Sequence, residues 1–414
     1  MIKVLYSIYT GEYPNEFSGG PNNIIYKLIQ NYDEGNYIFD YLSSDLFTEN
    51  LNQKNLIELR NKLSTKKKTA ALLSEKSMLY RKLFGSDFYL PYHFYKKNKY
   101  YKAFSQRILD YDIIHGQDSI SLSLVSNKNK FSKKIITVHS KGPLSDELRN
   151  MAKSEKLQNS IDRKLKEIEL KNVELVDLIT FPSNAAKVYF ENSLSLKLDI
   201  NKVRIIYNGI DFDKIHNINY DGILEKYSIE KKGKQLLLLN IAAHTSEKNI
   251  DILLKVVAEL KNKFNKDVLL INIGAEGNNT DTLKALADEL KINKNIKFLG
   301  KLENNEVIKF LKATDIFIMT SEKVIFDLVV LEALACGTCC VVSNEGGNKE
   351  IIKDGENGFL IDIDDVDSIA KKIISILPYK DKVRENAIKT ARQFSVQKMV
   401  NEYFEVYEGM LNGV

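Results

Sequence analysis

Cysteine is scarce in this chain of 414 residues, and the only three are Cys336, Cys339 and Cys340. Because they lie so close together, they cannot form a disulfide framework, and we expect a reducing compartment. Cys336 and Cys339 have C-x-x-C spacing, but no second pair and no nearby histidine completes a zinc site. The run TCCVVS that contains Cys339 and Cys340 predicts a buried strand instead.

Long apolar runs are also missing. No window of about 20 uninterrupted apolar residues exists, so we expect no membrane-spanning helix. The N-terminal MIKVLYSIY runs straight into a polar loop, unlike a signal peptide. Sixty Lys and Arg against 55 Asp and Glu leave a net charge of only +5. This predicts no nucleic-acid partner and is compatible with weak attraction to phosphorylated substrates or an anionic membrane.

At 414 residues, the chain is longer than a domain with a single hydrophobic core usually is, so we expect two or three domains. From residue 235 onward, apolar runs of strand length alternate with amphipathic segments. One such segment places Ile250, Leu253, Leu254, Val257, Leu260 and Phe264 at helical spacing. Strands that are apolar along their length and alternate with helices predict a parallel sheet covered on both faces, as in a Rossmann-like domain.

The first half has a looser pattern of the same kind, including a predicted helix around 158–176 with Ile161, Leu165, Ile168 and Leu175 on one face. The region 51–110 is rich in Lys and Tyr and has a weaker pattern. Within it, 76–110 is either a set of inserted helices with a solvated basic face or a contact surface for a membrane or an acceptor.

Ligands of open parallel sheets bind at the carboxyl ends of the strands, and several candidate residues follow predicted strands. Gly19 and Gly20 lie between the first strand and the following helix, where free peptide N–H groups suit a phosphate or a sugar. No G-x-G-x-x-G is present, which argues against a nicotinamide dehydrogenase. His139 ends a strand and His115 ends another, so either is a candidate donor of a hydrogen bond to a substrate.

Two further candidates lie in the second half. Lys248 follows the predicted strand near 235–243 and opens a helix, a position that suits a diphosphate. Glu332 lies in the apolar LVVLEALACG, where it forms either a structural ion pair or hydrogen bonds to a ribose diol. The peptide N–H groups of Leu328 and Val329, at the start of that helix, are candidates for holding a phosphate.

A series of motifs then runs along almost the whole chain: SGGPNN, ITVHS, FPSNA at 181–185, IIYNGID at 205–211, SEKN at 246–249, IKFLGKL at 296–302, ATDIFIMTS at 313–321, LVVLEALACGT at 328–338, EGGNKEII at 345–352 and DGENGFL at 354–360. In this order they resemble the retaining glycosyltransferases of family 4, which have the GT-B fold. The resemblance implies an α/β architecture of two Rossmann-like domains with parallel sheets facing across a cleft.

The domains that the resemblance implies are an acceptor-side domain over 1–212 and a nucleotide-sugar domain over 213–384. A C-terminal helix, at about 385–414, would cross back to complete the first domain. By position, Glu332 looks like the ribose-binding glutamate and Lys248 like the diphosphate-binding lysine. His139 looks like the histidine beside the transferred sugar, and Gly19 and Gly20 like the glycine loop beside the diphosphate. No metal or cofactor is expected.

The sequence departs from the family pattern beside the donor sugar. The family has a second glutamate eight residues before the first, and here that position is Val324. The usual Gly-Phe-Gly reads Ile325-Phe326-Asp327, and the usual arginine, five residues before the lysine, is Ala243. Three explanations are open. The donor pocket is rearranged, the chain is a non-catalytic partner of an active transferase, or it is a GT-B protein of another activity.

The favoured explanation is an active enzyme in which Glu322 or Asp327 supplies the missing carboxylate and His244 takes part of the arginine's place. Phe326, Leu328 and Val329 complete the expected donor-binding set. The donor would be a UDP- or GDP-sugar, and the acceptor a glycan, a lipid-linked glycan or a glycoprotein in surface polysaccharide or glycoconjugate synthesis. We expect a cytoplasmic enzyme, with the option of peripheral contact on the inner membrane face and of a partner glycosyltransferase.

Overall fold

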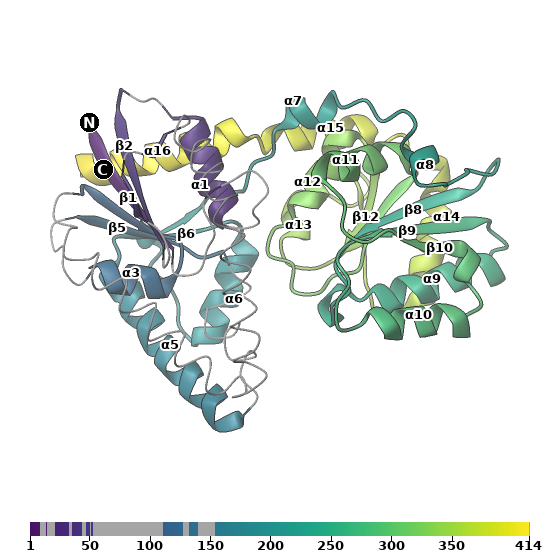
Figure 1. The fold of residues 1–414 in the computed structure, drawn as a ribbon, viewed down its shortest axis with the longest axis horizontal. Helices are drawn as coiled ribbons and strands as arrows, with labels where there is room; N and C mark the ends of the chain where they lie inside the picture. The colour runs from purple at the N-terminus through teal and green to yellow at the C-terminus, as the bar shows by residue number, and fades with distance from the viewer. Residues whose placement is uncertain are drawn as a thin grey trace, which may run out of the picture. The chain divides into compact units, whose positions relative to one another are not determined.

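The computed structural model describes residues 1–8, 14, 21–32, 35–43, 47–49, 51–52, 111–126, 132–139 and 154–413. The predictions for Gly19, Gly20 and the region 76–110 lie outside these residues. The chain divides into two compact units (Figure 1): unit 1 is Met1–Tyr207 with Met399–Val414, and unit 2 is Asn208–Lys398. The first boundary therefore falls after Tyr207, slightly earlier than the expected residue 212.

Unit 1 contains a sheet with the strand order β3-β2-β1-β4-β5-β6-β7. Its strands are β1 (Ile2–Ile8), β2 (Tyr37–Ser43), β3 (Phe47–Thr48), β4 (Ile113–Gly116), β5 (Lys133–Thr137), β6 (Leu178–Phe181) and β7 (Val203–Ile205). All pairs are parallel except β2 with β3, a short antiparallel edge pair that the sequence pattern did not predict. Buried side chains along β1 and β4 show why the strands read as continuous apolar runs.

Before the C-terminal helix, the described helices of unit 1 are α1 (Pro21–Gln30), α3 (Ser119–Ser126), α5 (Glu155–Leu175), α6 (Asn184–Leu194) and the 3₁₀ turn η2 (Ile200–Lys202). The face predicted for α5 needs a correction at its end. Leu165 is buried as expected, but Leu175 is 44% exposed. Glu169 and Asn172 are buried instead, and Asn172 Nδ2 donates to the Ser119 carbonyl oxygen at 2.6 Å. A polar contact to α3 therefore replaces the expected apolar one.

Unit 2 contains a wholly parallel sheet with the order β10-β9-β8-β11-β12-β13. Its strands are β8 (Leu236–Ile241), β9 (Val268–Ile273), β10 (Ile296–Phe298), β11 (Ile316–Met319), β12 (Cys339–Ser343) and β13 (Phe359–Ile361). In both sheets the chain order reverses beside the first strand, between β1 and β4 and between β8 and β11. Such reversals are where open α/β sheets bind ligands.

Helices follow the strands of unit 2 in the alternation that the sequence predicts. They are α7 (Phe212–His216), α8 (Ile223–Lys226), α9 (Ile250–Asn262), α10 (Thr280–Glu289), α11 (Asn304–Ala313), α12 (Leu328–Cys336), α13 (Asn348–Ile351), α14 (Val366–Ile376) and α15 (Arg384–Gln393), with the 3₁₀ turns η3 (Ser246–Lys248), η4 (Asn293–Asn295) and η5 (Leu377–Tyr379). The predicted apolar face of α9 is confirmed: Ile250, Leu253, Leu254, Val257 and Leu260 are all at most 2% exposed.

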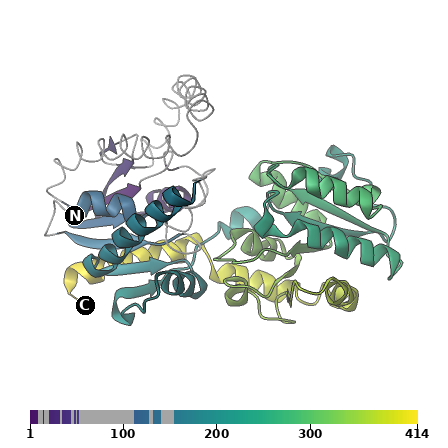
Figure 2. The same cartoon turned by 90° about the horizontal axis from the view of Figure 1, so that it is seen from below.

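The chain's last segment forms two helices, α15 and α16 (Val396–Asn412), where one helix from about residue 385 was expected. The break lies at Phe394 and Ser395, where the backbone bonds to Ile210: the Ile210 N–H donates to the Phe394 carbonyl oxygen at 2.9 Å, and the Val396 N–H donates to the Ile210 carbonyl oxygen at 3.0 Å. From Met399 onward, α16, drawn in yellow in Figure 2, belongs to unit 1. Its Tyr403 and Tyr407 are buried there.

A hydroxyl network fixes α16 to the sheet of unit 1. Tyr407 is fully buried, and its Oη lies 2.7 Å from His115 Nδ1 and 3.0 Å from Tyr6 Oη. His115 Nε2 lies 2.7 Å from Thr137 Oγ1. Tyr407 therefore joins the helix directly to β1 and β4, and through His115 to β5.

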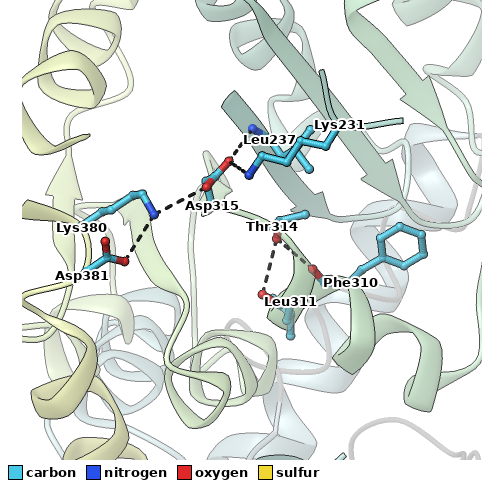
Figure 3. Close-up of polar contacts among 8 residues, drawn as sticks. All are labelled: Lys231, Leu237, Phe310, Leu311, Thr314, Asp315, Lys380 and Asp381. Atoms are coloured by element: carbon cyan, nitrogen blue, oxygen red, sulfur yellow. Dashed lines mark hydrogen bonds and ion pairs between the residues drawn. The ribbon is translucent and has the colours of Figure 1, made fainter. Parts of the chain in front are cut away.

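At the amino ends of β8 and β11, a carboxylate joins three segments of unit 2 (Figure 3). Asp315 Oδ2 accepts bonds from the Leu237 N–H and from Lys231 Nζ, both at 3.0 Å, and Oδ1 lies 3.5 Å from Lys380 Nζ. The neighbouring Thr314 hydroxyl donates to the Phe310 carbonyl oxygen at 2.9 Å and so caps the C-terminal end of α11. The end of α11 and the start of β11 are thus fixed by adjacent polar residues.

We expect Asp315→Ala to lower the free energy of unfolding of unit 2 by about 2 kcal/mol, because the Leu237 N–H loses a charged acceptor. Urea unfolding followed by circular dichroism measures the change. Asp381→Ala is the control, since Asp381 bonds the same Lys380 at 3.3 Å but is 84% exposed. Equal effects of the two substitutions would show that the lysine pairs, and not the amide contact, carry the stabilisation.

Candidate active site

The loops that follow β8 and β11 are bonded together at the carboxyl edge of the unit 2 sheet. The Thr320 hydroxyl donates to the carbonyl oxygens of Lys248 and Asn249, at 3.2 and 3.0 Å. Asn249 Nδ2 donates in return to the Thr320 carbonyl oxygen at 3.3 Å and to Glu322 Oε1 at 3.0 Å. The Glu322 N–H donates to the Glu247 carbonyl oxygen at 3.0 Å. These hydrogen bonds join the two loops into one edge of unit 2, which lies where the strand order reverses between β8 and β11.

This edge brings Lys248 and Asp327 together. Lys248 Nζ lies 4.0 Å from Asp327 Oδ2, and the two side chains are 24% and 31% exposed. Asp327 immediately precedes α12, but its side chain accepts no capping bond from the helix. The first peptide N–H groups of α12, which include those of Leu328 and Val329, are therefore not capped by Asp327. A lysine beside an amino-terminal helix end is an arrangement that attracts an anion.

Glu332 lies one turn further along α12 and is half-buried. Its Oε1 accepts a bond from Asn304 Nδ2 at 3.3 Å, and Asn304 is the first residue of α11. This contact joins α12 to the first residue of α11. The ribose-binding role of Glu332 stays a prediction.

The segment in which the sequence departs from the family pattern is packed inside unit 2. Val324 is 3% exposed, and its carbonyl oxygen accepts a bond from the Gly347 N–H at 2.9 Å. A Cβ atom on Gly347 would lie 1.9 Å from the Ile325 carbonyl oxygen, so only glycine allows this approach. Phe326 is 7% exposed and its ring lies 5.7 Å from that of Phe394. The Phe326 side chain therefore belongs to the core, which corrects its assignment to donor binding.

His244 also differs from its predicted role. It is 1% exposed, and its Nδ1 and Nε2 lie 2.9 Å from Thr280 Oγ1 and 2.8 Å from Asn272 Oδ1. Asn272 Nδ2 in turn donates to Asn240 Oδ1 at 2.8 Å. Both ring nitrogens are therefore used inside the fold, and His244 does not take the place of the missing arginine. It holds the loop after β8 against β9 and the start of α10.

In unit 1, His139 lies just beyond β5 and is half-buried. Its Nε2 lies 2.7 Å from Oε1 of Gln117, the first residue beyond β4. Burial lowers the pKa of His139 to about 3, so the ring is neutral at physiological pH. The structure thus places the predicted His139 at the carboxyl edge of its sheet, paired with a glutamine that the sequence analysis did not single out.

The second histidine considered for substrate binding, His115, has a structural role. It is fully buried, and both of its ring nitrogens are engaged by Tyr407 and Thr137. Burial lowers its pKa to about 3, with a smaller contribution from His139. The prediction that His115 bonds a substrate is therefore wrong, because both ring nitrogens are buried and bonded inside the fold.

The three cysteines are free and buried. Cys339 and Cys340 lie in β12, which confirms the predicted buried strand. Burial raises the pKa of Cys336 and of Cys339 to about 12, so these thiols remain protonated at physiological pH. Among the described residues, no group of three or more possible metal-ligating side chains occurs.

Comparison with known proteins decides the family. Residues 73–214 match the family model Glycosyltransferase Family 4, and residues 224–394 match Glycosyl transferases group 1. The chain belongs to the family 4 glycosyltransferases. Within its described part, no helix is both long and apolar enough to span a membrane.

Solved glycosyltransferases share the fold of this family 4 chain. One from Rickettsia africae superposes with a TM-score of 0.70 at 18% identity, covering 100% of this chain and 99% of its own. Anabaena HepE, crystallised with UDP and glucose, superposes with a TM-score of 0.68 at 16% identity, covering 99% and 100%. These likenesses confirm the predicted GT-B fold of two Rossmann-like domains.

Curated relatives of this family 4 chain are similar to it over part of their length. N-acetyl-alpha-D-glucosaminyl L-malate synthase of Bacillus anthracis is 28% identical over 50% of this chain and 54% of its own. An uncharacterised glycosyltransferase of Methanocaldococcus jannaschii is 27% identical over 73% and 76%. An Escherichia coli UDP-Gal:alpha-D-GlcNAc-diphosphoundecaprenol alpha-1,3-galactosyltransferase is 25% identical over 52% and 56%. The chain thus spans about half the length of the first of these relatives.

Several residues that shape the candidate site were not predicted. Asn249 and Thr320 join the two loops, Asn304 contacts Glu332, and Gln117 pairs with His139. Thr320 and Gln117 directly follow strands, Asn304 begins α11 and Asn249 immediately precedes α9, so each position carried a signal. Amides and hydroxyls in such places are also common caps and turn residues, and their partners are distant in the sequence.

Proposed function

We propose that this chain transfers a sugar from a nucleotide-diphosphate sugar to a glycan, a lipid-linked glycan or a protein-linked acceptor. The observation that carries the proposal is the joined edge of unit 2, where Lys248 lies beside the uncapped start of α12. A cation together with free helix N–H groups is suited to a diphosphate. The names of the relatives support nucleotide sugars as donors, since one is a UDP-Gal-dependent transferase and HepE was crystallised with UDP-glucose.

The proposed mechanism relies on positioning and charge stabilisation. As the bond between the sugar and the diphosphate breaks, negative charge grows on the leaving diphosphate. Lys248 and the first N–H groups of α12, those of Leu328 and Val329, would stabilise that charge. Glu332 would accept hydrogen bonds from the ribose hydroxyls. His139, which is neutral, would hydrogen-bond the transferred sugar without adding charge.

Asp327 is the better placed of the two candidates for the missing carboxylate. It lies beside Lys248, whereas Glu322 is exposed and bonds Asn249. Val324 cannot serve the same purpose, because its side chain is apolar and buried. We therefore propose that Asp327 faces the donor sugar and sets the orientation of Lys248.

We further propose retention of the anomeric configuration, with the departing diphosphate accepting the proton of the acceptor hydroxyl. No metal is needed in this scheme, because Lys248 and the helix start supply the positive potential. The enzyme would act in the cytoplasm in the synthesis of a surface polysaccharide or glycoconjugate. The product's anomeric configuration, read by NMR, tests retention directly.

A nucleotide-sugar screen tests the proposed function. UDP- and GDP-linked hexoses and N-acetylhexosamines are added to the purified protein, binding is measured by calorimetry, and release of nucleoside diphosphate is followed. Binding with turnover is expected and would identify the donor. Binding with no turnover, even with acceptors present, would favour the alternative of a non-catalytic subunit that recognises an acceptor beside an active transferase. Absence of binding to every donor would overturn the proposal.

We expect Glu332→Ala to weaken binding of the nucleoside diphosphate by about 10- to 100-fold, the loss of hydrogen bonds between a charged acceptor and two hydroxyls. Calorimetric titration with UDP and with GDP measures it. Glu345→Ala on the same unit is a control for the loss of one carboxylate. An unchanged affinity for the nucleotide would remove the ribose assignment from Glu332 and leave Asn304 as its partner.

A further inference from the structure

Gln117 carries an unsatisfied donor at the edge of the unit 1 sheet. It is 3% exposed, and its backbone N–H donates to the Ser7 carbonyl oxygen at 2.8 Å, at the end of β1. Its side-chain oxygen lies 2.7 Å from His139 Nε2. Its side-chain nitrogen, Nε2, is buried and bonds nothing in the described part of the chain. Buried donors without a partner are rare in folded proteins and usually await a ligand or a water molecule.

Gln117 lies at the carboxyl edge of the unit 1 sheet, the edge at which open parallel sheets bind ligands. Gln117 follows β4 and is tied to the end of β1, and the strand order reverses between these two strands. His139 follows β5, the next strand in the sheet. Two neighbouring strands therefore present an amide and an imidazole at the same edge.

The hydrogen bond between Gln117 and His139 determines which donor and acceptor atoms of the two side chains are left for a ligand. The amide oxygen of Gln117 accepts, so His139 must donate from Nε2, and a neutral ring then has a lone pair on Nδ1. No described residue bonds this Nδ1. The pair thus presents N–H donors on Gln117 and an acceptor on His139, and neither group is charged. This combination matches hydroxyl groups, which both donate and accept, better than it matches a phosphate or a cation.

We propose that Gln117 and His139 form a binding pair for neighbouring hydroxyl groups of a sugar. Gln117 Nε2 donates to one hydroxyl oxygen, and His139 Nδ1 accepts the proton of the next hydroxyl. This inference rests on the proposed function and adds Gln117 to the residues that bind the substrate. The sugar belongs either to the donor or to the acceptor, because both carry vicinal hydroxyls.

Gln117→Met tests the proposal, because methionine fills a similar volume without donors. With the donor found in the screen, we expect its KM to rise about tenfold while the Kd of the bare nucleoside diphosphate is unchanged, if the hydroxyls are the donor's. If they are the acceptor's, the acceptor KM rises by the same factor and the donor KM does not. Either result supports the pair.

A second variant separates direct contact from support of His139. Gln117→Glu keeps an oxygen acceptor for the His139 Nε2–H but removes both amide donors. Direct contact predicts a raised KM in this variant as well. A wild-type KM for both substrates in Gln117→Glu would overturn the proposal, since the donors would then touch no substrate.

Asn172→Leu is the matched control. Asn172 is also a buried amide of unit 1, 3% exposed, but its Nδ2 already donates to the Ser119 carbonyl oxygen. Its loss should lower the urea midpoint and leave both KM values unchanged. A wild-type enzyme without turnover of any donor would overturn the proposed function and this inference with it, whereas an active wild type with an unaffected Gln117→Met overturns this inference alone.

Discussion

Replacement of Lys248 by methionine is expected to lower kcat/KM for the nucleotide sugar by about 10²- to 10³-fold, the usual effect of removing one group that stabilises developing charge. The ammonium group lies beside the start of α12, so it would face the diphosphate as that group departs. Ala243 replaces the family's arginine, and His244 is committed to Thr280 and Asn272. In the proposed site, Lys248 is therefore the cation assigned to the diphosphate.

The fold should survive this change. Methionine keeps most of the apolar stem of Lys248, and the lysine's contact with Asp327 is long, at 4.0 Å, and partly exposed. The contacts that join the two loops use the Lys248 backbone, which the substitution leaves in place. Steady-state kinetics with the identified donor gives the loss in kcat/KM, and urea unfolding gives the stability.

Lys255→Met is the control for Lys248→Met. Lys255 lies on α9, the helix that follows Lys248, and bonds Asp251 at 3.0 Å with 45% of its side chain exposed. Within the described residues, no hydrogen bond or ion pair joins Lys255 to α12. An equal loss of activity in both variants would show that general charge, and not the position of Lys248, matters. Wild-type activity in Lys248→Met would remove the diphosphate role.

The second large effect concerns stability. Tyr407→Ala should lower the free energy of unfolding of unit 1 by about 3–5 kcal/mol, the range for deleting a large buried ring. The ring is fully buried, and its hydroxyl serves both His115 and Tyr6. Its loss leaves a cavity and also leaves a buried imidazole nitrogen without a partner.

Tyr407→Phe separates these two contributions. It keeps the ring and removes the hydroxyl, so we expect a loss of about 1–3 kcal/mol, the penalty for an unsatisfied buried polar group. Because the chain has two units, unfolding need not be two-state, and hydrogen exchange at the amides of β4 and β8 reports each unit separately. Protection should fall at β4 and remain at β8.

Tyr379→Ala is the corresponding control, since Tyr379 is 52% exposed in unit 2 and should change stability by no more than about 0.5 kcal/mol. Equal losses from Tyr407→Ala and Tyr407→Phe would place the whole effect in the hydroxyl. No loss from either would show that α16 is not held by this network.

The sequence alone determined the family, the α/β class and most of the elements of unit 2. Strands such as β8 are apolar at every position but one, Asn240, and α9 has a clear helical period. These patterns are local and follow from burial on both faces of a parallel sheet, so they can be read without knowing any partner. The order of the motifs predicted that Lys248 and His139 follow strands and that Glu332 lies on a helix, and the structure has them after β8, after β5 and on α12.

Only the tertiary structure decided what individual polar residues do. His115 and His139 both end strands, yet Tyr407, 292 residues away from His115, engages the first, while Gln117 pairs with the second. His244 was expected at the donor and is bonded inside the core. Histidines and amides accept many partners, and the partner is set by which distant segments the fold brings within about 3 Å, a distance that local pattern does not encode.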